Sequence, residues 1–398
     1  MTHTLTTGAP EVSRNAWLMM AAGLAGSANM RAFDSALPQL ADTLAITLGQ
    51  TGHFAAAFAL AYGLCQLPFG ILGDRIDKPT LVRFLAISSV MVMILTMFAS
   101  SYGDMLLLRL IAGGMASAVV PLSIAYIGDT VPFERRQMVL AYNMTALITG
   151  LMVGQVAGGI IAELVGWHGI PLFIALLYVP AIFGLRNEGR DAPAAASRHA
   201  PLSPLEAIRR IATNRFSRNV LGAGFLEGAT VFAISAFFGV LLAVRFDLPL
   251  SVVGLLLTLN ALGSISNLVV LRYLPASWGM RGHFTLGGLS AAGGVLILGL
   301  SPWLPLALVG LFLAGLGAAA IHNNLQTFAS QMVPEARATA FATFASTFFL
   351  SQAIGGVIFA TLLDLRGIRE IFFWPVPILL FLVWWFTRQM LRQAAAKT

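Results

Sequence analysis

The sequence predicts an all-α membrane protein with twelve transmembrane helices arranged as two six-helix halves. Three observations support this fold class. Of the 398 residues, 58% are hydrophobic and only 10% are charged, whereas a soluble domain is about 45–50% apolar and about 25% charged. The apolar residues form twelve runs of the length that a membrane helix needs, and not the short alternating segments of a membrane β-barrel. A polar, arginine-rich break follows the sixth run.

The apolar runs define the predicted helices in order. The first run is too long for the core of a signal peptide, so we expect it to remain as helix 1. The twelve predicted helices are 16–40, 51–73, 81–100, 105–128, 139–164, 169–186, 220–243, 250–274, 284–301, 304–330, 339–363 and 371–387. The predicted domains are therefore an N-terminal six-helix bundle (1–186), a linker (187–219) and a C-terminal six-helix bundle (220–398). Within the linker, residues 205–212 have the pattern of a short amphipathic helix on the membrane surface.

The distribution of basic residues predicts the orientation in the membrane. Lysine and arginine concentrate in the linker, in the even-numbered gaps between helices and near both chain ends. The odd-numbered gaps hold only Arg245, Arg366 and Arg369. Because basic loops stay in the cytoplasm, we expect both termini and the linker to be cytoplasmic, in a multi-pass protein of the inner (plasma) membrane. The basic excess is then a topology signal, so we expect no nucleic-acid partner.

Several classes of chemistry have no residues to support them. The only cysteine, Cys65, lies in an apolar run, so neither a disulfide framework nor a thiolate metal site is expected. The sequence contains no nucleotide-binding glycine loop and no HExxH zinc motif. We therefore expect no enzyme activity, no metal and no cofactor, with a proton gradient as the energy source.

A charged hairpin lies between helices 2 and 3, in the sequence FGILGDRIDKPT at 69–80. It resembles the loop between helices 2 and 3 of the major facilitator superfamily, which reads G-x-L-a-D-r-x-G-r-k. The matching residues are Gly70, Leu72, Asp74, Arg75 and Lys78. The alternative is an ordinary basic turn at the cytoplasmic face. The resemblance implies two pseudo-symmetric six-helix bundles (the major facilitator fold) and transport by alternating access.

The resemblance also implies a conformational gate at the cytoplasmic face. In that family the Asp and the basic residue of this motif lock the state that is open to the outside. Here Asp74 would lie at the amino end of helix 11, where the helix dipole favours an anion. Lys78 would pair with Asp129 at the end of helix 4.

Helix 5 contains small residues four positions apart, Gly150, Gly154 and Gly158, followed by Gly159. This spacing allows close contact between membrane helices. It resembles the G-x-x-x-G-P-x-x-G-G motif of the twelve-helix drug:proton antiporters, although Gln155 stands in the place of the proline.

The two halves also repeat one another. The sequence VPFER at 131–135 precedes helix 5 and VPEAR at 333–337 precedes helix 11, and a glycine pair follows in each helix. Repeated halves predict a transporter whose binding site lies between them, near the middle of the membrane.

Helices 1 and 4 provide the first candidate site, for proton coupling and substrate. Asn29, Arg31 and Asp34 lie in helix 1, and Arg109 lies in helix 4 at a similar depth below the outer surface. Burial favours a protonated carboxyl at Asp34, whereas two nearby arginines favour the carboxylate. If these groups separate when the halves move, a proton can bind and leave. The alternatives are a structural ion pair in helix 1 and an Arg109 side chain that reaches the outer interface.

Helices 7 and 10 provide the second candidate site. Glu227 is a lone carboxylate in helix 7, about two turns from its cytoplasmic end, and is either a cation or proton site or an interfacial residue. His322 and Asn323 lie late in helix 10 and are candidates for lining the cavity or forming a gate. A histidine with a purely structural hydrogen bond is the alternative.

We therefore expect a proton-coupled transporter that exports small apolar or amphipathic compounds. The alternative substrates are a sugar, an amino acid or an organic anion bound by Arg31 and Arg109, and another class is a membrane sensor without transport. The expected partners are a small-molecule substrate, protons and the lipid bilayer, and we expect a monomer.

Overall fold

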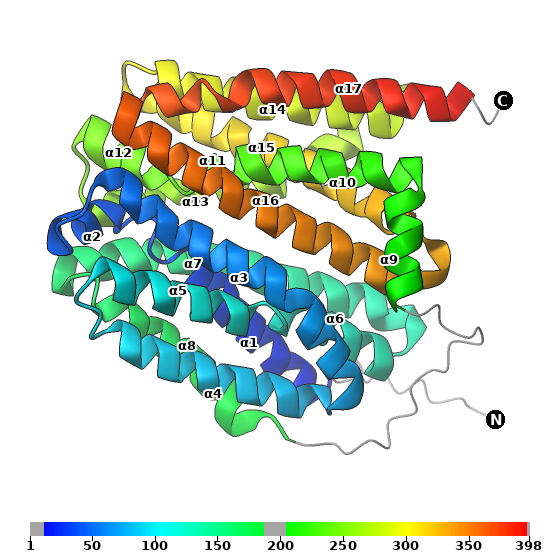
Figure 1. Ribbon diagram of the computed structural model, residues 1–398, viewed down its shortest axis with the longest axis horizontal. Coiled ribbons are helices and arrows are strands. Elements are labelled where there is room, and N and C mark those ends of the chain that lie inside the picture. Colours follow the sequence, from blue (N-terminus) through cyan, green and yellow to red (C-terminus); the bar gives the residue numbers. More distant parts are fainter. Residues whose placement is uncertain (1–11, 187–203, 396–398) are drawn as a thin grey trace, which may run out of the picture.

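The computed structural model describes residues 12–186 and 204–395 and shows a bundle of long helices (Figure 1). The helices of the first half are α1 (Arg14–Arg31), α2 (Leu37–Thr43), α3 (Leu48–Arg75), α4 (Lys78–Thr96), α5 (Tyr102–Ala116), α6 (Val119–Thr130), α7 (Phe133–Val165) and α8 (Gly169–Gly184). Those of the second half are α9 (Pro204–Thr213), α10 (Arg215–Glu227), the π-turn η1 (Gly228–Phe232), α11 (Ala233–Ser235), α12 (Phe238–Phe246), α13 (Leu250–Tyr273), α14 (Gly279–Leu300), α15 (Leu304–Ala329), α16 (Arg337–Arg366) and α17 (Pro375–Ala395). Single turns of 3₁₀ helix lie at Ala276–Trp278, Pro334–Ala336 and Glu370–Phe372.

The predicted all-α fold is confirmed. Among the described residues, nine helices are long and apolar enough to cross a membrane, and α2 with α3 passes the same test across a bend of 115°. The shorter α1 and α8 pack together in the same bundle. Grouped by their breaks, the described segments correspond to the twelve predicted helices: α1–α2, α3, α4, α5–α6, α7, α8, α10–α12, α13, α14, α15, α16 and α17.

Helices 1 and 4 are broken where the sequence predicts continuous helices. Helix 1 ends at Arg31 and resumes at Leu37, and helix 4 has a break between α5 and α6. The reason is a proline just after each break, because its ring excludes the carbonyl four residues earlier and it has no N–H to donate. The ring of Pro38 displaces the carbonyl of Asp34 in this way, and the ring of Pro121 displaces the carbonyl of Ser117. The break places Asp34 in a turn rather than in a regular helix.

Helix 7 is also interrupted, but without a proline. It begins at Arg215, five residues earlier than predicted, and widens into the π-turn η1 directly after Glu227. A second break follows α11, before Phe238. Gly228 opens the π-turn, and a Cβ there would collide with the backbone of Phe348 in α16. The π-turn η1 therefore lies against α16, the predicted helix 11.

The two halves meet along two long helix pairs, α3 with α16 and α7 with α13 (Figure 1). We call the end of the bundle that carries α2 and α12 the outer end, as the orientation predicts, and the end that carries α9 the inner end. Four hydrogen bonds between described residues of the two halves, from Arg31 to Ser235, from Thr47 and Gly49 to Asp364 and from Ser251 to Glu163, lie in the outer part of the interface. The largest buried apolar cluster also crosses from one half to the other there, through Phe54, Phe237 and Phe359. The structure is therefore closed at its outer end.

The described part of the predicted linker contains the helix α9 and the first turn of α10, because helix 7 begins at Arg215 and not at 220. The predicted amphipathic helix is present, and it buries Ala207 and Ile211 and exposes Arg209 and Arg210. The rest of the predicted linker, 187–203, lies outside the described residues. The orientation in the membrane stays a prediction.

Candidate functional site

Arg109 lies inside the N-terminal half and is only 2% exposed. Its Nη1 donates to the side-chain oxygen of Asn29 at 2.9 Å and to the Asn29 backbone carbonyl at 3.2 Å. The guanidinium also lies over the rings of Phe33 and Phe58, at 5.0 and 4.5 Å from their centroids. The alternative of an arginine that reaches the outer interface is therefore wrong for this structure, and Asn29 is its hydrogen-bond partner.

Arg31 and Asp34 form the predicted ion pair at 3.1 Å. Arg31 also donates to the hydroxyl of Ser235 in α11, at 2.9 Å, so one guanidinium joins helix 1 to helix 7 of the other half. Asp34 is 4% exposed and lies within electrostatic range of Arg109. The cluster thus holds two arginines and one carboxylate. Sequence reasoning missed Ser235, because a serine in an apolar helix has no distinctive pattern.

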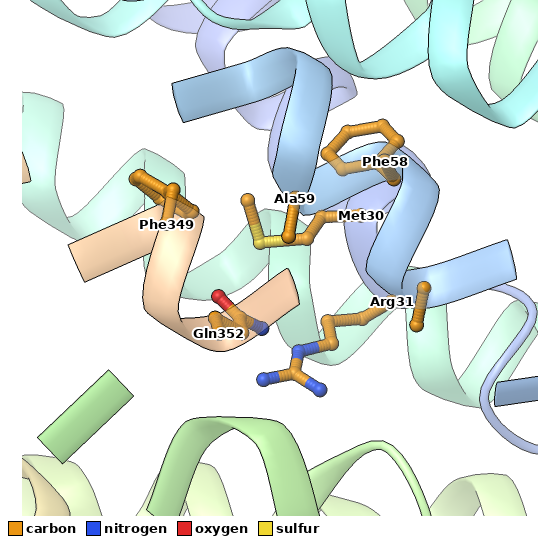
Figure 2. A pocket seen from close by; sticks show the side chains of 7 residues that line it. Met30, Arg31, Phe58, Ala59, Phe349 and Gln352 are labelled. Carbon is orange, nitrogen blue, oxygen red and sulfur yellow. The ribbon is translucent and has the colours of Figure 1, made fainter. Parts of the chain in front are cut away.

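A narrow cavity lies beside this cluster, between α1, α3 and α16 (Figure 2). Its lining is Met30, Arg31, Ala55, Phe58, Ala59, Phe349 and Gln352. The space admits about one water molecule. Gln352 is 8% exposed, and its amide makes no hydrogen bond to another described residue. The cavity is therefore mostly apolar, with one guanidinium and one unpaired amide.

Glu227 is fully buried in the C-terminal half, so the expectation of an interfacial residue is wrong. Because helix 7 begins at Arg215, this carboxylate lies about 18 Å along the helix. One carboxylate oxygen is 3.2 Å from Nδ1 of His322, and the other has no partner among the described residues. His322 also lies 2.9 Å from the amide of Gln326. The second candidate site is thus a buried Glu–His pair.

Aromatic rings surround this pair. The rings of Phe232, Phe344 and Phe348 lie 5.4, 6.0 and 4.7 Å from the imidazole of His322. Together with the full burial of Glu227, these rings give the pair a largely apolar environment.

Asn323 does not join the second candidate site. Its side chain is exposed, whereas the neighbouring Asn324 is buried and donates to Nδ1 of His283 at 2.7 Å. The other nitrogen of His283 lies 2.7 Å from Asn267. His283 thus joins Asn267 of α13 and Asn324 of α15 to its own helix, α14. Sequence reasoning missed this three-residue cluster because its members lie in three different helices.

The predicted gate is described in part. Lys78 and Asp129 form the expected ion pair at 2.7 Å, between the start of α4 and the end of α6. Asp74 belongs to α3, but the predicted place of its side chain at the start of helix 11 lies outside what the structure describes. Arg75 is exposed. A Cβ at Gly70 would meet open space, so no close approach occurs at that glycine in this conformation.

The glycines of helix 5 lie where backbones meet. A Cβ at Gly150, Gly154 or Gly158 would collide with the backbone of α1 or of the turn after it. Gly159 instead meets the backbone of Leu250, in the other half. The glycine motif therefore holds α7 against α1 and, at its outer end, against α13 of the other half.

Among the described residues, no group of three or more metal-ligating side chains occurs.

Comparisons with known proteins agree on one family. The family model described as Major Facilitator Superfamily matches residues 19–336 and 220–397. The Uncharacterized MFS-type transporter MJ1560 of Methanocaldococcus jannaschii is 22% identical over 83% of this chain and 86% of its own length. The Multidrug export protein EmrB of Haemophilus influenzae is 25% identical, over 40% of this chain and 32% of its own length.

The crystal structure of a mutant form of the nucleoside transporter NupG has the same fold. Its TM-score is 0.77, with 13% identity over 94% of this chain and 99% of that chain.

Proposed function

Because this chain belongs to the major facilitator superfamily, we propose that it is a proton-coupled secondary transporter that exports small apolar or amphipathic compounds by alternating access. The observation that supports proton coupling is the cluster of the half-buried Arg31 with the buried Asp34 and Arg109 at the boundary between the halves. Charges inside a membrane are costly and mark ion or proton pathways.

The cluster is arranged so that movement of the halves changes it. Arg31 contacts Asp34 in its own half and Ser235 in the other half. When the outer end opens, Ser235 withdraws and Arg31 loses an acceptor, so its position beside Asp34 changes. A carboxylate gains or loses a proton when its cationic neighbour moves. Asp34 is therefore our candidate proton carrier, with Arg31 and Arg109 tuning it.

Export of apolar or amphipathic compounds rests on the cavity and on one relative. The cavity is too small for a substrate in this conformation, but five of its seven lining residues are apolar, so a cavity that widens there when the halves move would suit a substrate with an apolar body. The partial likeness to EmrB, a protein named for multidrug export, favours the outward direction. We place the protein in the inner membrane with both termini cytoplasmic, acting as a monomer on small molecules and protons.

A second candidate function is the proton-coupled transport of an organic anion. Two arginines, the buried Arg109 and the half-buried Arg31, accompany one carboxylate in the cluster, so one positive charge lacks an anionic partner among the described residues there. Arg31 and Gln352 both line the cavity (Figure 2). A substrate carboxylate would supply the missing charge.

Proteoliposomes with a trapped pH-sensitive dye test the proposed function. A panel of neutral, cationic and anionic amphipathic compounds is added while a pH gradient is imposed. A compound that dissipates the gradient only in the presence of the protein identifies proton-coupled transport, and its charge separates the two candidates. If no compound in the panel moves protons or crosses the membrane through the protein, the transport proposal is wrong and a sensor becomes the better reading.

A further inference from the structure

Asp364 joins the two halves at the outer end of the bundle. It lies in the last turn of α16, in the second half. One of its oxygens accepts from the hydroxyl of Thr47 at 2.6 Å, and the other accepts from the backbone N–H of Gly49 at 2.8 Å. Thr47 is the N-cap of α3 and Gly49 is in its first turn. A carboxylate from one half therefore caps a helix of the other.

Glu163 makes the corresponding contact on the opposite side. It lies in the last turn of α7, in the first half, and accepts from the backbone N–H of Ser251 at 2.8 Å. Ser251 is in the first turn of α13, whose N-cap, Pro249, makes no side-chain capping hydrogen bond. Glu163 thus supplies an acceptor that α13 lacks in its own sequence, at a helix end where the dipole favours an anion.

The two contacts are related by the internal repeat. Each carboxylate stands three residues before the glycine that ends its helix, and Gly166 and Gly367 have φ angles of 86° and 87°. The helices α7 and α16 occupy equivalent places in the two halves. So do α13 and α3, the helices whose N-termini receive the caps. The same kind of contact occurs at equivalent places in both halves, which indicates a repeated feature of the fold and not an accidental contact.

We propose that Glu163 and Asp364 form a two-part latch that holds the outer end closed, and that opening to the outside releases both contacts. Around the latch the interface between the halves is tightly packed. A Cβ at Gly49 would collide with Ala360, and one at Gly52 would collide with Phe237. Apolar packing alone does not fix the alignment of two helices, whereas each cap requires its carboxylate to meet one helix start.

The latch predicts how the conformational equilibrium responds to loss of each carboxylate. Both side chains are exposed, so each contact is weakened by solvent. Replacing either by alanine should favour opening by about two- to fivefold, and replacing both should favour it by about tenfold. A role limited to stabilising a helix end would lower stability without opening the outer end.

A cysteine at position 360 reports on opening. Ala360 is 1% exposed and lies in this interface, and Cys65→Ser removes the natural thiol. In Ala360→Cys protein in right-side-out vesicles, a membrane-impermeant maleimide added outside should label faster in Glu163→Ala and Asp364→Ala, and fastest in the double variant. Asp104→Ala is the matched control, because Asp104 is an outer-end carboxylate that caps the first turn of its own helix.

The proposal is overturned if the double variant labels at the wild-type rate, or if Asp104→Ala accelerates labelling equally. Spin labels on Thr43 and Asp247, one in each half at the outer end, give a second measurement in detergent. Their distance distribution should gain a longer component in the double variant, and an unchanged distribution would also contradict the latch. Neither readout requires a substrate, so the latch can fail or hold independently of the proposed transport function.

Discussion

Asn29→Leu tests whether Arg109 depends on a single side-chain acceptor. The guanidinium is buried, and its described hydrogen bonds go only to the side chain and backbone of Asn29. Leucine keeps a similar volume but removes the oxygen at 2.9 Å, so a buried charged N–H loses its side-chain partner. We expect the folded protein to lose stability.

The expected magnitude follows from the burial of both groups. Neutral hydrogen bonds between membrane helices contribute about 0.6–1.7 kcal/mol, and hydrogen bonds to charged groups contribute about 1.5–3 kcal/mol. We take about 2 kcal/mol for this bond, because both partners are almost fully buried. For a protein of this size that corresponds to a fall in melting temperature of about 3–5 °C.

The assay is thermal melting of detergent-solubilised protein, followed by fluorescence-detected gel filtration. Asn29→Asp is the informative partner variant, because a carboxylate at the same distance forms a stronger, charge-assisted bond and supplies the missing negative charge. It should melt at or above the wild-type temperature. Asn323→Leu, at an exposed position, is the control. The reasoning is refuted if Asn29→Leu melts like this control, or if Asn29→Asp is as destabilised as Asn29→Leu.

Three other predictions concern packing, gating and topology. Gly158→Ala should reduce the yield of folded protein, because its Cβ would collide with the backbone after α1, whereas Gly293→Ala meets open space and should not; equal gel-filtration profiles would contradict this. Asp74→Asn should shift the protein toward the state open to the cytoplasm and slow transport without lowering expression. Unchanged cysteine accessibility and unchanged transport in this variant would contradict the predicted gate. Reporter fusions after Arg198 should be cytoplasmic and those at Gly103 external, and the opposite pattern would show that the basic residues misled the orientation.

Local contacts were predictable from the sequence, and most long-range ones were not. The Arg31–Asp34 pair follows from a spacing of three residues, and Lys78–Asp129 follows from the family resemblance. The Glu227–His322 pair joins residues 95 positions apart in different helices, and no periodic pattern marks such a partner.

Some breaks in the helices can be predicted from the sequence, and others cannot. Pro38 and Pro121 are visible in the sequence and account physically for two breaks, although composition alone led to continuous helices there. The π-turn after Glu227 has no such marker, because it depends on how Gly228 packs against α16. The carboxylates of the latch do stand at repeated places before Gly166 and Gly367, but their partners become evident only when the halves are brought together.

The central claim, that Asp34 carries the coupling proton, is tested most directly by Asp34→Asn in proteoliposomes. The probe is a compound that the wild-type protein moves in the dye assay, used in radiolabelled form. Two modes are measured on the same preparation: transport driven by a pH gradient, and exchange of labelled for unlabelled compound with no gradient. The account predicts that the variant loses gradient-driven transport and keeps binding and exchange. Full gradient-driven transport by Asp34→Asn would contradict it, reduce the Arg31–Asp34 contact to a structural ion pair, and make Glu227 the next residue to test.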